Sequence, residues 1–191
     1  NQGYFTLKGC SNMLLLKRLP SARLCCLLTI LALLCLALPQ SVHAGTLWNF
    51  ASSQDVGQYT STIILNNLPA VAYYDVTASD LRFTTCFNAQ CDNGTITTTP
   101  DSDGDVGKYA SMGNILGRPI ISYYDDTNND LKILACGNIQ CTSGNIVTTL
   151  DSGPNDVGQY SALLVDATTV YVAYYDATFG DLKIIRCLNI V

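Results

Sequence analysis

Aspartate and tyrosine are the side chains of this sequence that could do chemistry and that recur at a fixed spacing. The pattern D-V-G-x-Y begins at residues 55, 105 and 156; a Y-Y-D triplet ends 20 residues after each of these aspartates, and a D-L pair begins 25 residues after it. Carboxylates are ligands that Ca²⁺ prefers, and they also accept hydrogen bonds from sugar hydroxyls, while aromatic rings pack on apolar sugar patches. The candidate ligand or cation face comprises Asp55, Asp75, Asp80, Asp105, Asp125, Asp130, Asp156, Asp176, Asp181, Tyr74, Tyr124 and Tyr175.

An architectural role for the same residues is the alternative, and it is the interpretation we favour. Aspartates accept hydrogen bonds from backbone N–H groups in turns, and tyrosines pack between sheets with their hydroxyls bound to a partner. A feature that every repeat carries is more often architecture than a site. Multivalent lectins, which repeat their binding sites, keep the ligand interpretation open.

The residue types that are missing exclude several classes of enzyme. The chain contains no Glu, and its only His, His43, precedes the repeats. The repeats therefore cannot form a Ser-His-Asp triad, a His-based zinc site or a glycosidase pair of glutamates. Any catalysis would depend mainly on Asp, Tyr, Lys or Arg, and we predict no catalytic residue and no cofactor.

One turn resembles the start of a calcium-binding loop. Asp101-Ser102-Asp103-Gly104-Asp105 follows the pattern D-x-D-x-D, but the bidentate Glu that completes such a loop is missing from the chain. The equivalent turn, residues 151–156, does not keep the pattern. An acidic turn is the favoured interpretation, and Ca²⁺ is the cation that the sequence leaves open.

Cysteines recur in pairs with four residues between them, Cys86 with Cys91 and Cys136 with Cys141. In a secreted protein, each pair is expected to form a disulfide across the hairpin between the third and fourth strands of its repeat. A metal site of four thiolates is the alternative, but the two pairs would have to converge from different repeats. Cys187 begins a third copy of this loop, and its partner is expected one residue beyond the end of the sequence.

The first 44 residues have the organisation of an export signal. Basic residues precede an apolar run at residues 24–38, and V-H-A ends at Ala44. These features are typical of a signal peptide, which we place at residues 13–44 with the cut after Ala44. Residues 1–12 are then an upstream or non-native segment.

Two alternatives for this leader were weighed. A transmembrane anchor is disfavoured because the apolar run has fifteen residues, fewer than the roughly 20 that span a bilayer. A lipoprotein anchored through Cys35 is disfavoured because Leu34 stands where a small residue is usual.

Export changes the charge of the protein. The leader holds four of the ten basic residues and none of the fifteen acidic ones, so residues 45–191 carry a net charge of −9. Phosphate binding requires clustered Lys and Arg, which disfavours nucleic acid and anionic membranes as partners. We expect a secreted or cell-surface protein with no stable membrane span after cleavage, whose partners are glycans or extracellular proteins.

The spacing of the motifs also predicts the elements that position them. In the first repeat, four short strands are expected at residues 59–65, 70–75, 80–86 and 94–99. Runs of β-branched and aromatic residues between Gly, Asn and Asp turns predict an all-β fold. Four strands in a period of 50 and then 51 residues predict a β-propeller of four-stranded blades. A β-solenoid, whose coils are usually shorter, is the alternative.

The mature chain, residues 45–191, is therefore expected to form a partial propeller. Its divisions are a closing strand at 45–54, blades at 55–104 and 105–155, and a truncated blade at 156–191. Two full blades and three strands of a third are fewer than the roughly four to eight blades of a closed propeller. The expectation is that the gene continues beyond Val191.

The repeat resembles that of a group of predicted secreted bacterial β-propeller proteins, which runs V-G-x-Y-x-S, then I-S-Y-Y-D, then D-L-K-Y-A-x-C. The second repeat here carries V-G-K-Y-A-S, I-S-Y-Y-D and D-L-K-I-L-A-C. The resemblance covers residues 45–191 and implies a secreted propeller without an assigned activity. A more distant resemblance is to sialidase-like propellers, but their S-x-D-x-G-x-x-W box, Glu and Arg triad are missing, so sialidase activity is not expected.

We therefore predict a secreted, non-catalytic binding or scaffold module that binds carbohydrate or protein. The alternative is a fragment of an extracellular propeller hydrolase or lyase whose catalytic residues lie in blades outside this sequence. A single blade with a unique His, Glu or Arg cluster would favour the enzyme.

Overall fold

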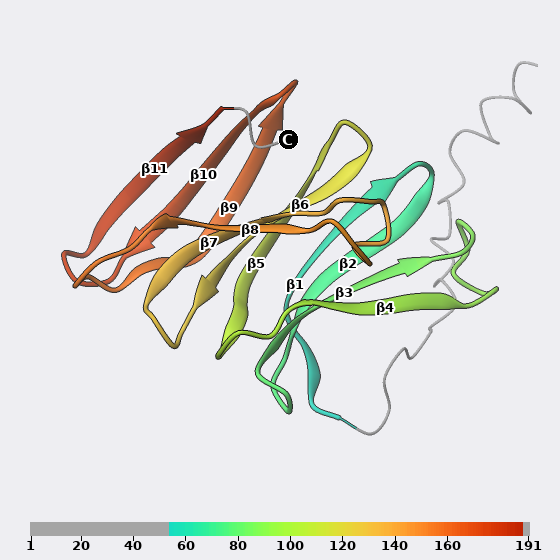
Figure 1. Ribbon diagram of the computed structural model, residues 1–191, viewed down its shortest axis with the longest axis horizontal. Helices are drawn as coiled ribbons and strands as arrows, with labels where there is room; N and C mark the ends of the chain where they lie inside the picture. The colour runs from blue at the N-terminus through green and yellow to red at the C-terminus, as the bar shows by residue number, and fades with distance from the viewer. Residues whose placement is uncertain (1–53, 189–191) are drawn as a thin grey trace, which may run out of the picture. The chain divides into compact units, whose positions relative to one another are not determined.

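Residues 54–188 form three antiparallel β-sheets and contain no helix (Figure 1). The computed structural model describes this part of the chain. Its strands are β1 (Val56–Leu65), β2 (Leu68–Asp75), β3 (Asp80–Cys86), β4 (Thr95–Asp101), β5 (Val106–Ile115), β6 (Arg118–Asp125), β7 (Asp130–Ala135), β8 (Ile146–Asp151), β9 (Val157–Asp166), β10 (Thr169–Asp176) and β11 (Asp181–Cys187). The predicted upstream segment, signal peptide and closing strand lie outside the described residues, apart from Gln54.

Each sheet is built from one repeat. The strand orders are β1-β2-β3-β4, β5-β6-β7-β8 and β9-β10-β11, so every strand pairs with its neighbour in sequence. The all-β prediction is confirmed, as is the division of the first two repeats into four strands. The third repeat contributes three strands within the described residues.

The first strand of each sheet begins earlier than the sequence suggested. β1 starts at Val56, three residues before the Tyr at which we predicted it. The pairing with β2 shifts between Gln58 and Ser61, and Tyr59 has a φ of 53°, so the strand contains a bulge. A bulge lets pairing continue on both sides of an extra residue, and Tyr109 and Tyr160 have the same backbone conformation.

The hairpin turn between β5 and β6 is short. Arg118 pairs with Ile115 and is the first residue of β6. The turn consists of Leu116 and Gly117, with φ values of 50° and 80°. Two left-handed residues are what a tight two-residue hairpin requires.

The sheets pack face to face in chain order, with their first strands in contact. The backbone N–H of Met112 in β5 donates to Ser61 Oγ in β1 at 2.9 Å, and that of Leu163 in β9 donates to Ser111 Oγ in β5 at 2.9 Å. One apolar core lies between the first and second sheets and another between the second and third. Burial of these apolar faces is the main force that holds the sheets together.

The glycine of D-V-G is the point of closest approach between sheets. A Cβ at Gly107 would lie 2.8 Å from the Cα of Leu81, and one at Gly158 would lie 2.7 Å from the Cα of Leu131. Both glycines have a positive φ, 109° and 106°. Beside them, the N–H of Val157 donates to Asn129 O at 3.0 Å, and Val106 makes the equivalent bond to Ser79 O. The motif therefore docks each sheet on the D-L motif of the preceding one.

Replacement of Gly158 by Ala is expected to lower the free energy of unfolding by about 1–3 kcal/mol more than replacement of Gly57 by Ala. Both positions have a positive φ, so both variants carry the same backbone strain. Only at Gly158 would the added Cβ clash with backbone atoms, those of Leu131, since nothing lies within 4 Å of a Cβ at Gly57. Urea denaturation at low protein concentration measures the difference, and equal losses would contradict the close-approach role.

Candidate functional site

The three motifs of each repeat meet at one end of its sheet. Val56 pairs with Asp75, Asp75 with Asp80, and Leu81 with Asp101, so the four strands bring these residues together. The other two sheets repeat this register over the strands that they contain. We call this the aspartate end; it comprises Asp55, Asp75, Asp80 and Asp101 with their equivalents Asp105, Asp125, Asp130, Asp151, Asp156, Asp176 and Asp181.

The aspartates of the Y-Y-D triplets are fully buried, and each contacts the turn that follows it and a basic residue, although Asp176 Oδ2 accepts no hydrogen bond. Asp125 Oδ1 accepts hydrogen bonds from the N–H groups of Thr127 and Asn128 at 3.1 and 3.0 Å, and Asp75 and Asp176 bind the turns that follow them in the same way. Each also pairs with a basic residue of the third strand: Arg82–Asp75 at 3.0 Å, Lys132–Asp125 at 2.7 Å and Lys183–Asp176 at 3.0 Å. These carboxylates stabilise the turn and are not free to bind a ligand.

The ion pair of the middle sheet shows how burial and partners compete. Burial raises the pKa of Asp125, but the hydrogen bonds from Lys132 and Asn128 outweigh it and hold this pKa below its usual range. Burial lowers the pKa of Lys132. The hydrogen bond to Asp125 and the negative charge of Asp101 raise it by more, so the pKa of Lys132 lies above its usual value. Both groups are therefore ionised at neutral pH.

In the second and third sheets the first tyrosine of the triplet binds the preceding sheet, whereas Tyr73 of the first sheet shares a hydrogen bond with Thr84 of its own sheet. Tyr123 donates from its hydroxyl to Asp101 Oδ2 at 2.6 Å, and Tyr174 donates to Asp151 Oδ2 at 2.6 Å. Lys132 lies 3.7 Å from the same oxygen of Asp101, so Tyr and Lys share one carboxylate of the neighbouring sheet. Burial raises the pKa of Tyr123, and the bond to Asp101 raises it further, so the phenol stays protonated.

Sequence reasoning did not identify Asp101 and Asp151 as partners of these tyrosines. Each lies 46 residues after the Asp of its own D-V-G motif, and this shared offset was the signal that could have found them. We considered Asp101 only as part of a calcium loop. In the structure the Asp101 carboxylate accepts one hydrogen bond from the Tyr123 hydroxyl and another, at 3.1 Å, from the backbone N–H of Asp103.

The second tyrosine of each triplet binds the following sheet. Tyr74 donates to Asp105 Oδ1 at 2.7 Å, and Tyr124 donates to Asp156 Oδ1 at 2.8 Å. Although partial burial raises the pKa of Asp105, the bonds from Lys108 and Tyr74 lower it below its usual value. Tyr175, the third member, is 37% exposed and has no such carboxylate among residues 54–188.

The D-L aspartates, Asp55 and Asp156 are the carboxylates at the aspartate end that form no side-chain ion pair with another described residue. Asp80 and Asp130 are half-buried and Asp181 is exposed. Burial raises the pKa of Asp80 and of Asp130, and the charge of Asp125 adds to the effect at Asp130. Residues 54–188 contain no group of three or more His, Cys, Asp or Glu side chains placed to hold a metal ion, so the calcium interpretation gains no support there.

A row of tyrosines from the first strands lies beside these carboxylates. The ring centroids of Tyr59 and Tyr109 are 4.5 Å apart, and those of Tyr109 and Tyr160 are 4.4 Å apart. Tyr59 is 39% exposed and Tyr160 is 64% exposed. We call these three residues the tyrosine row. Sequence reasoning also missed this row, because it placed the three tyrosines in strands but gave no sign that the bulge turns their rings toward one another.

The surroundings of the row combine aromatic surface with hydrogen-bonding groups. Each ring also lies 6.1–6.3 Å from the second tyrosine of its own sheet. Lys108 and Gln159 each precede a tyrosine of the row by one residue. Lys108 Nζ contacts Asp105 at 2.8 Å, and Gln159 Nε2 contacts Asp156 at 3.0 Å. Burial raises the pKa of Tyr109, and the neighbouring tyrosine hydroxyls raise it further, so the middle ring is a neutral phenol.

The opposite end of the sheets carries the disulfide loops. Cys86 pairs with Cys91 and Cys136 with Cys141, with Cα–Cα distances of 5.0 and 4.8 Å, as predicted. These pairs leave no set of four thiolates for a metal. Cys187 is a free, half-buried thiol in the described part of the chain, and its burial raises the pKa.

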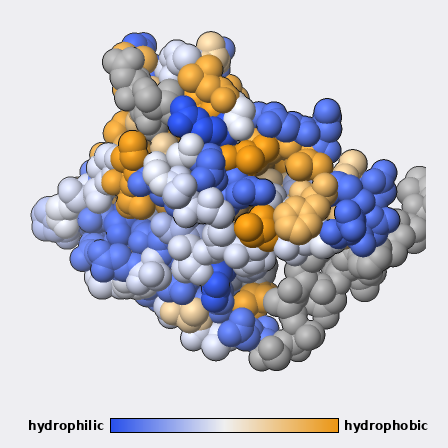
Figure 2. All heavy atoms as spheres, turned by 45° about the vertical axis from the view of Figure 1, so that its right-hand side comes forward, coloured by the Kyte–Doolittle hydropathy of each residue, from blue (hydrophilic) through white to orange (hydrophobic). Residues whose placement is uncertain are grey.

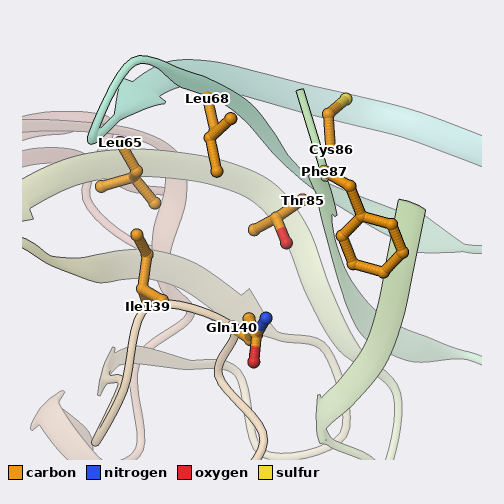
Figure 3. A pocket seen from close by; sticks show the side chains of 7 residues that line it. All are labelled: Leu65, Leu68, Thr85, Cys86, Phe87, Ile139 and Gln140. Atoms are coloured by element: carbon orange, nitrogen blue, oxygen red, sulfur yellow. The ribbon is translucent and has the colours of Figure 1, made fainter. Parts of the chain in front are cut away.

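A small cavity of about 250 Å³ lies between the disulfide loops of the first two sheets (Figure 3). Its lining residues are Leu65, Leu68, Thr85, Cys86, Phe87, Ile139 and Gln140. Figure 3 shows the side chains of the first sheet facing Ile139 and Gln140 of the second. The lining is mostly apolar and includes no acid or base, so it offers no groups for catalysis.

Comparisons with protein-family models, curated proteins and solved structures gave no match. The resemblance to secreted bacterial propellers therefore stays a prediction from the repeat. Among residues 54–188 there is also no helix with the length and apolar character that crossing a membrane requires.

Replacement of Lys132 by Met is expected to lower the free energy of unfolding by about 3 kcal/mol at neutral pH, because it leaves the Asp125 carboxylate buried without its partner. Lys108→Met is the matched control, since its partners Asp105 and Asp126 are 30% and 43% exposed and such pairs contribute at most about 1 kcal/mol. Urea denaturation of both variants gives the comparison.

The same pair of variants has a pH signature. The lowered pKa of Asp125 stabilises the wild-type fold above the ordinary Asp value, near 3.9, and this stability is lost as the pH falls through the lowered pKa. The deficit of Lys132→Met should therefore shrink in acid. A deficit that does not change with pH would show that lost packing, not lost charge, explains it.

Proposed function

We propose that this chain is an extracellular, non-catalytic binding module made of β-propeller blades, and that its tyrosine row binds carbohydrate. The observation that carries the proposal is a row of three aromatic rings, of which the outer two are exposed and the middle one is half-buried, edged by carboxylate, amide and ammonium groups. The rings supply surface for the apolar faces of sugars, and the polar groups supply partners for sugar hydroxyls.

The packing of the sheets supports the propeller part of the proposal. Propeller blades are four-stranded antiparallel sheets arranged around an axis. Here β1 contacts β5 and β5 contacts β9, and the second and third sheets dock on the preceding sheet through the same D-V-G contact. A repeated interface of this kind rotates each sheet relative to the last by a similar angle, as blades require.

The cysteine pairs and the leader support an extracellular location. Hairpin disulfides persist in oxidising compartments and are rare in reducing ones. Residues 13–44 match a signal peptide in their order of basic, apolar and small residues.

The charge of the chain favours neutral sugars over acidic ones. The tyrosine row is flanked by Asp105 and Asp156, and residues 45–191 have an excess of acidic residues. A sialylated or uronic-acid glycan would be repelled at this surface, whereas neutral hydroxyls can donate to the carboxylates.

A non-catalytic role agrees with the state of the aspartates. In the second and third sheets, Lys132 and Lys183 hold the pKa of the buried Asp125 and Asp176 carboxyls below its usual value, while burial and a carboxylate partner raise the pKa of Tyr123 and Tyr174. General acid–base catalysis works best with groups whose pKa lies near the working pH. These groups are instead fixed in one protonation state.

The carbohydrate proposal predicts that the chain binds a neutral oligosaccharide on a glycan array. With that oligosaccharide as the probe, Tyr109→Ala should weaken binding at least tenfold in titration calorimetry, which corresponds to about 1.4 kcal/mol. Thermal unfolding of the variant shows whether the fold is kept.

Phe87→Ala is the control, because Phe87 is a 52% exposed aromatic at the opposite end of the first sheet. Its affinity should equal that of the wild type. Absence of binding to every glycan, or weakening by Phe87→Ala without weakening by Tyr109→Ala, would refute the proposed site.

The extracellular proposal predicts that the four hairpin cysteines are protected in the exported protein. Alkylation under denaturing conditions without reductant should leave Cys86, Cys91, Cys136 and Cys141 unmodified, and prior reduction should make all four reactive. Mass spectrometry of the digested protein reads this directly. Alkylated Cys86 or Cys91 in the unreduced sample would show that the hairpin disulfide is not formed.

A further inference from the structure

The loop after the first disulfide carries the one Asn-Gly dipeptide of the sequence, Asn93-Gly94. The backbone nitrogen that follows an asparagine can attack its side-chain amide, and glycine leaves that nitrogen unshielded because it has no Cβ. Every other asparagine of the chain is followed by a residue with a Cβ. The sequence therefore singles out one amide for this reaction.

Asn93 is exposed, and its place in the repeat is exposed whichever neighbouring sheet is docked. Asn93 has the complete second sheet docked after it, and Ser143, its equivalent in the second loop, has the complete first sheet docked before it; both are exposed. Figure 2, in which the side of the first sheet comes forward, shows polar residues around separate apolar areas. Water therefore reaches the amide, and this does not depend on the lack of a neighbour on either side.

Side-chain hydrogen bonds hold the equivalent part of the second loop. Asn145 Oδ1 accepts from the N–H of Gly137 at 3.2 Å, and Asn145 Nδ2 donates to Cys141 O at 3.0 Å. Asn138 Nδ2 donates to Ser143 O at 3.4 Å and to Ser143 Oγ at 3.0 Å. The backbone on both sides of Gly144 is therefore fixed.

The first loop lacks these bonds. Asn88 binds Asp92, and Gly94 O accepts from the N–H of Phe87 at 3.1 Å. Among residues 54–188, no hydrogen bond involves the Asn93 side chain or the N–H of Gly94. Both groups that would react are therefore unengaged, and the backbone between them is held only through the Gly94 carbonyl.

We propose that Asn93 is a site of spontaneous deamidation in the folded protein, made reactive by this unheld loop. The Gly94 nitrogen gives up its proton to water and forms a bond to Cγ of Asn93, and the Cγ–Nδ2 bond breaks with release of ammonia. The product is a cyclic imide, and a second water molecule adds to one of its two carbonyl carbons and opens the ring. One opening gives an ordinary aspartyl residue, and the other gives an isoaspartyl residue whose main chain runs through the side-chain carbon.

The isoaspartyl product disturbs the contacts that close the loop. Its main chain is longer by a carbon atom just before Gly94, so Gly94 O moves relative to the N–H of Phe87 while Thr95 stays paired with Cys86. The Phe87 ring also lies on Gly94, 3.3 Å from the Cβ position. We therefore expect the modified loop to open locally, while the aspartate end, at the other end of the sheet, keeps its structure.

Peptide mass spectrometry after incubation of the native protein at neutral pH tests the site. Asn93 should convert about tenfold faster than any other described asparagine, a ratio that a difference of about 1.4 kcal/mol in the barrier produces. The conversion replaces NH by O in the mass of the peptide, and chromatography separates the aspartyl from the isoaspartyl form. Native protein that stays unconverted, while the denatured chain converts at Asn93, would overturn the proposal.

Ser143→Asn is the matched variant, because it places the same dipeptide in the second loop, where Asn138 and Asn145 hold the backbone. The new amide should convert several-fold more slowly than Asn93 in the native protein and at the same rate in the denatured chain. Equal rates in the native protein would contradict the role of the unheld loop.

Hydrogen exchange at the backbone amide of Phe87 tests the effect of the modification. The isoaspartyl form should lose protection there. Asn93→Asp is the control, since it carries the same charge on a main chain of ordinary length, and it should keep the protection. An isoaspartyl form as protected as the control would refute the predicted opening. The glycan experiment concerns the other end of the sheets, so its outcome is independent of this one.

Discussion

Adjacent sheets are joined by a buried polar bridge on which their alignment depends. In the middle of the molecule it consists of Asp125, Lys132, Tyr123 and Asp101, with the last residue contributed by the preceding sheet. Apolar burial supplies most of the attraction between sheets, but it has no direction and tolerates sliding. A buried charge does not tolerate sliding, because a small displacement of one sheet relative to the other would leave a carboxylate without its hydrogen-bond donors. We infer that the bridge sets the register in which the apolar faces pack.

The bridge also explains why the motifs have their spacing. The tight turn after Asp125 pairs it with Asp130, and this register places Tyr123 directly opposite Lys132. Opposite residues of neighbouring strands point to the same face, so the phenol and the ammonium reach one carboxylate together. The next residue along, Tyr124, points the other way and binds the following sheet. A Y-Y dipeptide thus connects three sheets, which a single tyrosine could not do.

The sequence was sufficient for features that depend on local periodicity. The order of the strands, the hairpins that join them and the pairing of Cys86 with Cys91 follow from short-range patterns, and the structure has them. Features that depend on packing between repeats were harder to predict. The partnership of Asp101 with Tyr123 joins residues of two different sheets, and the facing rings of Tyr59 and Tyr109 depend on a bulge that strand periodicity does not reveal.

The favoured architectural interpretation of the aspartates also has a physical limit. It describes Asp75, Asp125 and Asp176, which are buried and engaged. It does not describe the tyrosine row, whose outer members are exposed although their motif repeats as regularly as the aspartates do. Repetition in the sequence therefore does not tell a structural residue from a ligand-binding one. The burial of the side chain and its hydrogen-bond partners do.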